Sequence, residues 1–139
     1  MKKETDKILR GEGKILLMDD EDIIRQVMGR VLKHLGYEVQ LAKDGAEMIE
    51  MYKKAKESRQ PFHAVIMDLT ISGEMGGKEA IEGLIEIDPK VKAIVSSGYS
   101  NDPIMTDYRK YGFSAAVAKP YGIKELSEIL HKVIVGIGE

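Results

Sequence analysis

The chain has 139 residues, of which 43% are hydrophobic and 32% are charged, values typical of one soluble globular domain. A net charge of −2 gives no electrostatic reason to bind nucleic acid or an anionic membrane. The absence of cysteine excludes disulfides, thiolate metal sites and a cysteine nucleophile. No apolar run is long enough for a membrane span and no stretch is typical of a signal peptide, so we expect a cytoplasmic location.

Two hydrophobic patterns alternate along the chain after a polar lead-in of residues 1–13. Short apolar runs bounded by turn residues predict five strands, at Lys14–Met18, Tyr37–Ala42, His63–Met67, Val91–Val95 and Phe113–Ala118. Helical spacing and helix-start signals predict helices within residues 23–35, 46–52, 80–85, 101–111 and 123–134. Strict alternation of strand and helix predicts a doubly wound α/β fold, in which helices cover both faces of a parallel sheet. We expect residues 14–139 to form this single domain.

Polar side chains stand at the ends of four predicted strands. Asp19 and Asp20 follow the first strand, Asp68 the third, Ser96 the fourth and Lys119 the fifth. Taken singly, each has an ordinary structural explanation, such as acids at the start of a helix or turn formers at the end of a strand. Ligands of doubly wound folds bind outside the carboxyl ends of the strands. The coincidence of all five residues at that edge therefore favours a phosphoryl site.

The residue types at this edge favour a hard cation. With no cysteine and no paired histidines, oxygen ligands indicate Mg²⁺, which commonly takes one or two carboxylates and keeps several waters. We predict Asp20 and Asp68 as direct ligands, Asp19 as a ligand through water, and the backbone carbonyl of Thr70 as a further ligand. Beside such an ion, Asp68 is the candidate nucleophile for phosphoryl transfer, and Lys119 is the ammonium that stabilises the transferred oxygens.

Four segments, "ILLMDDE", "AVIMDLT", "AIVSSGY" and "VAKPY", resemble in their order and spacing the receiver domain of two-component response regulators, over about residues 14–136. The resemblance implies a flavodoxin-like strand order of 2-1-3-4-5 and Mg²⁺-dependent transfer of a phosphoryl group from a histidine kinase's phosphohistidine to Asp68. It also implies that Ser96 is the switch hydroxyl and that the domain catalyses only its own phosphorylation and dephosphorylation. The chain departs from the common pattern at Ala116, where many receivers carry an aromatic residue, and at Ser72, where proline is frequent.

Other functions fit parts of the same pattern. A Mg²⁺-dependent phosphatase of the haloacid dehalogenase type also uses an aspartate nucleophile, but it requires Asp-x-Asp where this chain has adjacent Asp19 and Asp20. A nucleotide-binding loop does not fit the region of "GEMGGKEA", because Ser72 and Glu79 stand where glycine and a hydroxyl residue belong. A degenerate receiver that acts only as a binding module stays open as an alternative, which an Mg²⁺ titration separates from a functional site.

The resemblance also indicates partners. The Gly-Glu-Gly of the lead-in and the segments "DLTISGEMGGKEA" and "VSSGYS" are most similar to receivers of hybrid sensor histidine kinases. We therefore expect a sensor kinase as partner, either in trans or in the same parent chain. The chain is expected to be either a stand-alone regulator or a receiver of a larger protein. A phosphorelay or target protein is expected on the surface of residues 101–111, the fifth strand and the fifth helix.

Thr70 and Gly98 occupy the positions that flank the hydrolytic water in receivers, and because Gly98 has no side chain we predict slow self-dephosphorylation.

Overall fold

The computed structural model describes residues 10–69, 76–98 and 101–136. Strands and helices alternate along the chain, and the strands are β1 Lys14–Met18, β2 Glu38–Ala42, β3 Ala64–Asp68, β4 Ala93–Ser97 and β5 Ala115–Ala118. The α-helices are α1 Asp22–His34, α2 Gly45–Glu57, α3 Gly77–Ile87, α4 Pro103–Thr106 and α5 Ile123–Val135, and a 3₁₀ helix, η2, follows α4 at Tyr108–Tyr111. No helix in these described ranges is long and apolar enough to cross a membrane.

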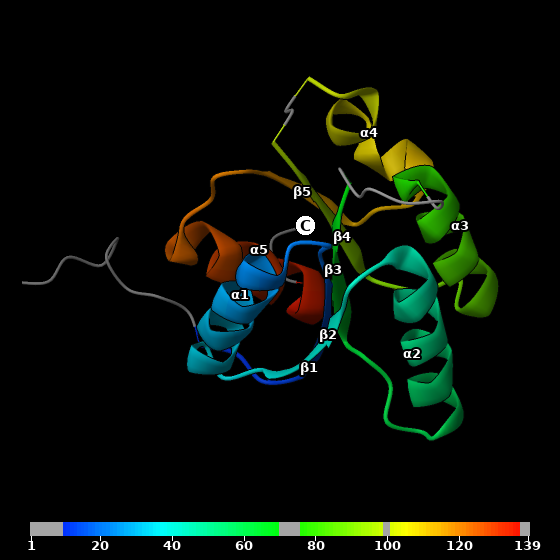
Figure 1. The fold of residues 1–139 in the computed structure, drawn as a ribbon, viewed down its shortest axis with the longest axis horizontal. Helices are drawn as coiled ribbons and strands as arrows, with labels where there is room; N and C mark the ends of the chain where they lie inside the picture. Colours follow the sequence, from blue (N-terminus) through cyan, green and yellow to red (C-terminus); the bar gives the residue numbers. More distant parts are fainter. Residues whose placement is uncertain (1–9, 70–75, 99–100, 137–139) are drawn as a thin grey trace, which may run out of the picture.

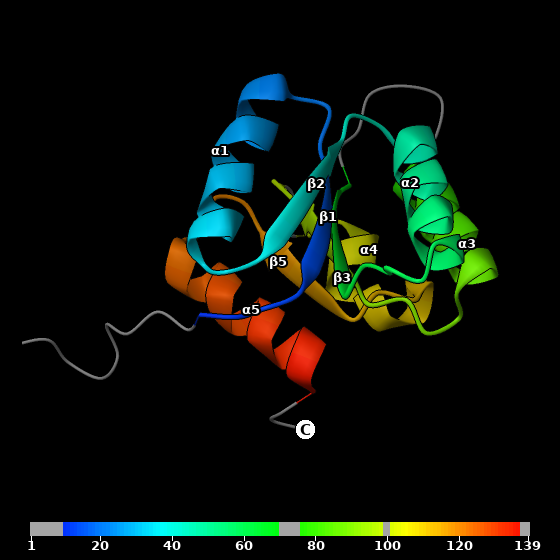
Figure 2. The ribbon, with the colours of Figure 1, turned by 90° about the horizontal axis from the view of Figure 1, so that it is seen from below.

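The strands form one parallel five-stranded sheet in the order β2-β1-β3-β4-β5. Helices α1 and α5 lie on one face of this sheet, and α2, α3 and α4 lie on the other (Figures 1 and 2). The architecture confirms the predicted doubly wound fold and the strand order that the resemblance implies. The order reverses between β1 and β3, so the carboxyl ends of these two strands border the crevice where such folds bind ligands.

Each strand sends alternate side chains to the two faces of the sheet. On β1, Ile15 and Leu17 join the core beneath α1 and α5, whereas Leu16 and Met18 join the core beneath α2 and α3. All four side chains are at most 2% exposed. Because both faces of the sheet are covered, the central strands appear in the sequence as continuous apolar runs rather than as alternating ones.

The prediction of one continuous helix over residues 101–111 is wrong. Asp107, with φ −129° and ψ 43°, separates the four residues of α4 from η2. The start is as expected, because the side chain of Asp102 accepts a backbone hydrogen bond in the first turn of α4 at 2.9 Å. Within α4 the buried residue is Met105. One buried side chain gives no apolar stripe that would hold a longer helix against the sheet.

A hydrogen bond connects α2 to the end of α3. Tyr52 donates it to Asp88, with 2.8 Å between Oη and Oδ2, and the ring of Tyr52 is buried. We expect Tyr52→Phe to lower the free energy of unfolding by about 1 kcal/mol at neutral pH, because the ring packing stays and one hydrogen bond to a carboxylate is lost. Urea denaturation of the two proteins measures this difference.

The loss should also depend on pH. Burial alone would raise the pKa of Asp88, but the hydrogen bonds from Tyr52 and the backbone of Lys90, together with the charge of Lys56, hold it below its ordinary value of 3.8. A carboxylate with a lowered folded-state pKa contributes stability above its unfolded pKa and loses it as the pH falls through the folded value. The difference between wild type and Tyr52→Phe is therefore expected to shrink below pH 3.8. An equal difference at every pH would show that packing, and not the charged hydrogen bond, had changed.

Candidate functional site

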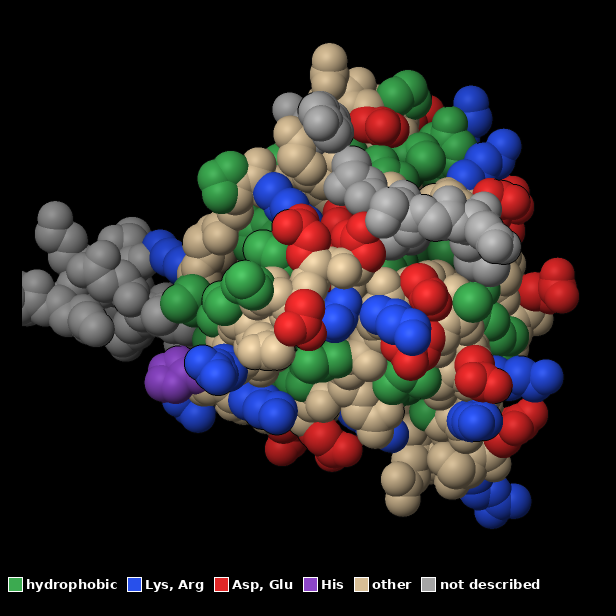
Figure 3. All heavy atoms as spheres, in the orientation of Figure 1, with side chains coloured by type: hydrophobic (Ala, Val, Ile, Leu, Met, Phe, Trp, Pro, Cys, Tyr) green, Lys and Arg blue, Asp and Glu red, His purple; other side chains and the backbone are tan. Residues whose placement is uncertain are grey.

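The carboxyl edge of the sheet gathers the polar residues that stand at the strand ends. β1 runs into Asp19 and Asp20, β3 ends on Asp68, and β5 runs into Lys119. Ser96 of β4 pairs with Asp68 in the strand register. Acidic side chains gather beside a basic one in the middle of the face seen in Figure 3, where Figure 1 shows the loop from β1 to α1. The fold therefore builds one charged site from residues far apart in the sequence.

Lys119 contacts two buried carboxylates. Its Nζ lies 3.2 Å from Oδ2 of Asp19 and 3.3 Å from Oδ2 of Asp68. These two acidic side chains are 4% and 2% exposed, so solvent screens the ion pairs weakly. The backbone holds the lysine in place, because the N–H of Lys119 donates to the carbonyl of Ser97 at 2.8 Å. This hydrogen bond positions the backbone of Lys119 beside the end of β4, and from there the ammonium reaches Asp68.

The surroundings of Lys119 keep its side chain charged. Burial alone would lower the pKa of Lys119, but the carboxylates of Asp68 and Asp19 outweigh this effect and raise the pKa above its ordinary value of 10.5. The side chain is therefore an ammonium at neutral pH, with three N–H donors for oxygens that lie nearby. It also offsets the repulsion between the two buried carboxylates.

A second group of carboxylates lies on the loop from β1 to α1. The carboxylates of Asp19, Asp20 and Glu21 each offer an oxygen within 4.8 Å of the others. The loop is held by the N–H of Asp19, which donates to the carbonyl of Ala42 at 3.1 Å, and by the N–H of Glu21, which donates to Oδ1 of Asp19 at 2.9 Å. Carboxylate oxygens are the ligands that Mg²⁺ prefers, and a divalent cation would relieve the repulsion among them. The residues present therefore fit a magnesium ion.

Arg25 of α1 fixes the same loop. Its guanidinium donates one hydrogen bond to the backbone carbonyl of Asp19 at 2.7 Å and another to the carboxylate of Asp22 at 2.9 Å. A planar guanidinium can hold both acceptors at once, which an ammonium does less well. No role for Arg25 or Glu21 is predicted from the sequence. The i,i+3 spacing of Asp22 and Arg25 indicates their ion pair on a helix, but the contact with Asp19 depends on the path of the loop.

The structure brings most of the predicted site residues to one edge, namely Asp19, Asp20, Asp68, Ser96 and Lys119. Thr70, predicted to offer a backbone carbonyl to the metal, and Ser72 lie outside the described residues. The chemical roles assigned to these side chains stay predictions, because geometry alone does not test them.

Comparison with protein families agrees with this fold. A family model described as the response regulator receiver domain matches residues 15–131. The chain belongs to this family, whose members are signalling modules of two-component systems. The family indicated by the four sequence segments is thereby confirmed.

The relatives include a regulator that this chain matches over nearly its whole length and a sensor kinase that it matches over a small part. The chemotaxis protein CheY of Thermotoga maritima is 32% identical over 121 residues, which cover 86% of this chain and 96% of CheY. The sensor kinase CckA of Brucella abortus is 30% identical over 137 residues, which cover 96% of this chain but 14% of the kinase. Among solved structures, the receiver domain of sensor histidine kinase PA1611 from Pseudomonas aeruginosa is similar at a TM-score of 0.77 and 24% identity, covering 90% of this chain and 99% of that one. That structure has a magnesium ion coordinated in its active site cleft.

Proposed function

We propose that this chain accepts a phosphoryl group on Asp68 from the phosphohistidine of a sensor histidine kinase, in a Mg²⁺-dependent reaction. The observation that carries the proposal is the contact of Lys119 with both Asp68 and Asp19, next to the acidic group of the β1–α1 loop. The kinase acts in trans or is part of the same parent chain. The magnesium ion in the PA1611 receiver domain supports the choice of cation.

The buried carboxylate of Asp68 supplies the nucleophile. One of its oxygens attacks phosphorus, a P–O bond forms, and the P–N bond to the donor histidine breaks with its electron pair staying on the imidazole nitrogen. Lys119 donates hydrogen bonds to the transferred oxygens in place of its contact with Asp68. Asp19, Asp20 and Asp68 would hold Mg²⁺, which when bound supplies positive charge for the phosphoryl oxygens.

An apolar groove beside Lys119 is where we place the donor helix of the kinase. The groove has a volume of about 440 Å³ and is lined by Ile24, Val27, Met28, Lys119, Pro120 and Tyr121. Val27, which lines the groove, is 50% exposed, and Ile23, four residues before it on α1 and outside the lining, is 74% exposed. Apolar side chains exposed together mark a protein interface. An amphipathic helix that lays its apolar face in this groove would bring its histidine to the edge where Asp68 lies.

The phosphoryl group signals by favouring one of two conformations of the domain. In this proposal Ser96 and Lys119 contact the phosphoryl group, because Ser96 is the strand neighbour of Asp68 and Nζ of Lys119 lies 3.3 Å from it. Lys119 directly follows β5. The elements that neighbour β5 are therefore expected to respond. We place the target protein on the surface formed by α4, η2, β5 and α5.

A small phosphodonor tests the acceptor function without a kinase. The chain incubated with acetyl phosphate and Mg²⁺ is expected to gain the mass of one phosphoryl group, and EDTA is expected to prevent the gain. A chain that binds Mg²⁺ but never gains this mass would be a binding module instead. Equal labelling with and without EDTA would contradict the part assigned to the metal.

In this proposal Gly98, which lies just past β4, determines how long Asp68 stays phosphorylated. A Cβ added at Gly98 meets no atom within 4 Å in the described part of the chain, so a longer side chain has room there. We expect Gly98→Glu to accelerate self-dephosphorylation by about tenfold, because a carboxylate at this position can orient a water in line with the P–O bond. A time course of phosphate release from the two phosphorylated proteins measures the effect.

The matched control for this prediction is Gly122→Glu, because a Cβ at Gly122 is equally unhindered. This variant should release phosphate at the wild-type rate. A wild type that already releases phosphate as fast as Gly98→Glu would contradict the explanation by water positioning.

A further inference from the structure

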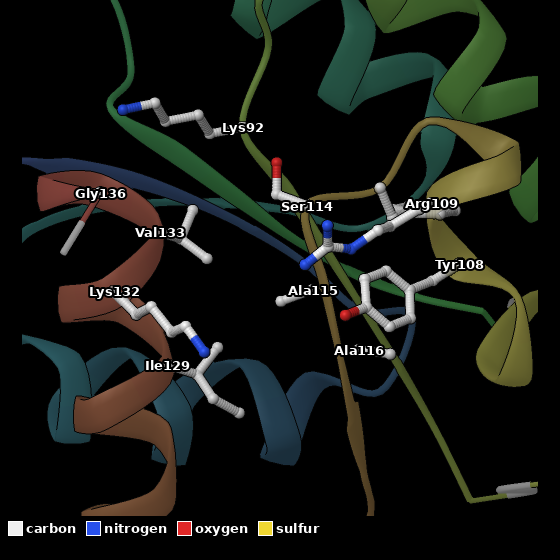
Figure 4. A pocket seen from close by; sticks show the side chains of 11 residues that line it. Lys92, Tyr108, Arg109, Ser114, Ala115, Ala116, Ile129, Lys132, Val133 and Gly136 are labelled. Atoms are coloured by element: carbon white, nitrogen blue, oxygen red, sulfur yellow. The ribbon is translucent and has the colours of Figure 1, made fainter. Parts of the chain in front are cut away.

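Arg25 differs from the other arginines of the chain in its burial. Its side chain is 17% exposed. The other arginines are all exposed, namely Arg10, Arg30, Arg59 and Arg109. Figure 4 shows one of these, Arg109, near the ring of Tyr108 at the edge of a surface pocket, with 5.8 Å between the guanidinium and the ring centre. Taking a guanidinium out of water is unfavourable unless it gains hydrogen bonds. The position of Arg25 therefore depends on the acceptors beside it.

These acceptors lie on both sides of the acidic loop. Nη1 of Arg25 donates to the backbone carbonyl of Asp19, just past β1, at 2.7 Å. Nη2 donates to Oδ1 of Asp22, the first residue of α1, at 2.9 Å. Asp20 and Glu21 stand between these two points in the sequence. One planar side chain thus connects the end of the strand to the start of the helix across the loop.

The same contact keeps Asp22 apart from the other acids of the loop. Its second carboxylate oxygen, Oδ2, accepts a hydrogen bond from Gln26 at 3.1 Å, so donors occupy both oxygens. In the described part of the chain, the group of three carboxylates whose oxygens lie within 4.8 Å of one another consists of Asp19, Asp20 and Glu21. Asp22 is outside this group although it is adjacent in sequence. It serves instead as an anchor for the guanidinium of Arg25.

We propose that Arg25 is a positioning residue that makes the acidic loop selective for Mg²⁺ over larger divalent cations such as Ca²⁺. Mg²⁺ is small and demands near-ideal octahedral geometry, whereas Ca²⁺ accepts irregular ligand arrangements. A loop held at Asp19 and Asp22 offers its oxygens in one arrangement, and a loosened loop still suits the more tolerant ion. Arg25 acts through the backbone of Asp19 and not by contact with the cation. The inference rests on the proposed Mg²⁺-dependent function, because it concerns the same site.

Two simpler roles for Arg25 lead to different expectations. The positive charge of Arg25 repels any divalent cation nearby, and this effect depends on charge alone. A purely structural role, as an ion pair at the start of α1, would change the free energy of unfolding and leave cation binding unchanged. Neither role distinguishes Mg²⁺ from Ca²⁺. The ratio of the two affinities therefore isolates the positioning role.

Arg25→Lys tests this role, because lysine keeps the charge and loses the planar pair of donors. Isothermal titration calorimetry of the full chain with MgCl₂ and, separately, with CaCl₂ measures the two affinities. We expect the affinity for Mg²⁺ to fall by about tenfold and the affinity for Ca²⁺ by about twofold at most. The matched control is Arg30→Lys, the same substitution at an exposed position of α1. It should leave both affinities unchanged.

Asp22→Ala is a second test, which removes the anchor and keeps the arginine. The side chain of Asp22 is 70% exposed, so its loss leaves the packing of the core intact. Without this anchor the guanidinium no longer holds the loop in one arrangement, and the preference for Mg²⁺ over Ca²⁺ should fall here too. A preference that stays at the wild-type value in either variant, or equal losses of affinity for the two cations, would overturn the proposal.

Acetyl phosphate labelling separates this inference from the proposed function. Arg25→Lys retains Asp68 and every carboxylate of the acidic group, so saturating Mg²⁺ should restore the wild-type labelling rate. A rate that saturating Mg²⁺ does not restore would overturn the proposal, because Arg25 would then act on more than the cation. A labelled wild type whose preference for Mg²⁺ survives Arg25→Lys contradicts this inference alone. A wild type that binds Mg²⁺ and is never labelled contradicts the acceptor function alone.

Discussion

Asp68→Asn is expected to abolish phosphorylation by acetyl phosphate. The substitution keeps the shape of the side chain but replaces the attacking carboxylate with an amide, which is a poor nucleophile. The labelling rate should fall by at least about a hundredfold, because the reaction loses its nucleophile. Intact-mass spectrometry of wild type and variant, incubated side by side with Mg²⁺, measures this rate.

Asp19 is the competing acceptor in this experiment, because it is also buried and also contacts Lys119. Asp107→Asn is the matched control, since Asp107 is exposed and lies between α4 and η2, away from the strand ends that form the site. It should be labelled like wild type. Labelling that persists in Asp68→Asn and disappears in Asp19→Asn would move the acceptor to Asp19 and contradict our assignment.

The fold could be predicted because short segments carry its pattern. Strands covered on both faces appear as continuous apolar runs, and the predicted bounds of β1 agree with the structure. The predicted starts of β2, β4 and β5 are too early, at Tyr37, Val91 and Phe113. These three residues are buried in the loops that lead into the strands. Burial therefore extends beyond the hydrogen-bonded ladder, and hydrophobicity alone does not show where pairing begins.

The candidate site could be predicted to the extent that strand ends place it. In a parallel sheet a residue just past a strand is carried to the carboxyl edge whatever its neighbours are, so Asp68 and Lys119 were found from their positions. Contacts that depend on a loop turning back, such as the one between Arg25 and Asp19, have no such signal.

Asp20→Ala and Lys119→Ala are expected to affect Mg²⁺ binding differently. Removing the carboxylate of Asp20 takes one ligand from the acidic group, so the affinity should fall by at least about tenfold. Removing the ammonium of Lys119 takes away no ligand and deletes a positive charge that lies 3.3 Å from Asp68, so the affinity should stay the same or rise. Ser96→Ala removes no carboxylate and should bind Mg²⁺ like wild type. Isothermal titration calorimetry with Mg²⁺ alone measures all three.

Labelling by acetyl phosphate separates the same variants a second time. Asp20→Ala lacks affinity for the metal, so a high Mg²⁺ concentration should restore much of its labelling rate. Lys119→Ala keeps the metal but lacks the ammonium that stabilises the transferred oxygens, so no Mg²⁺ concentration should restore its rate. Hydrogen exchange of β5, η2 and α5 on addition of beryllofluoride should likewise change in wild type and stay unchanged in Lys119→Ala. Equal losses of Mg²⁺ affinity in Asp20→Ala and Lys119→Ala would contradict both roles, because Lys119 would then hold the metal-binding loop and not the phosphoryl group.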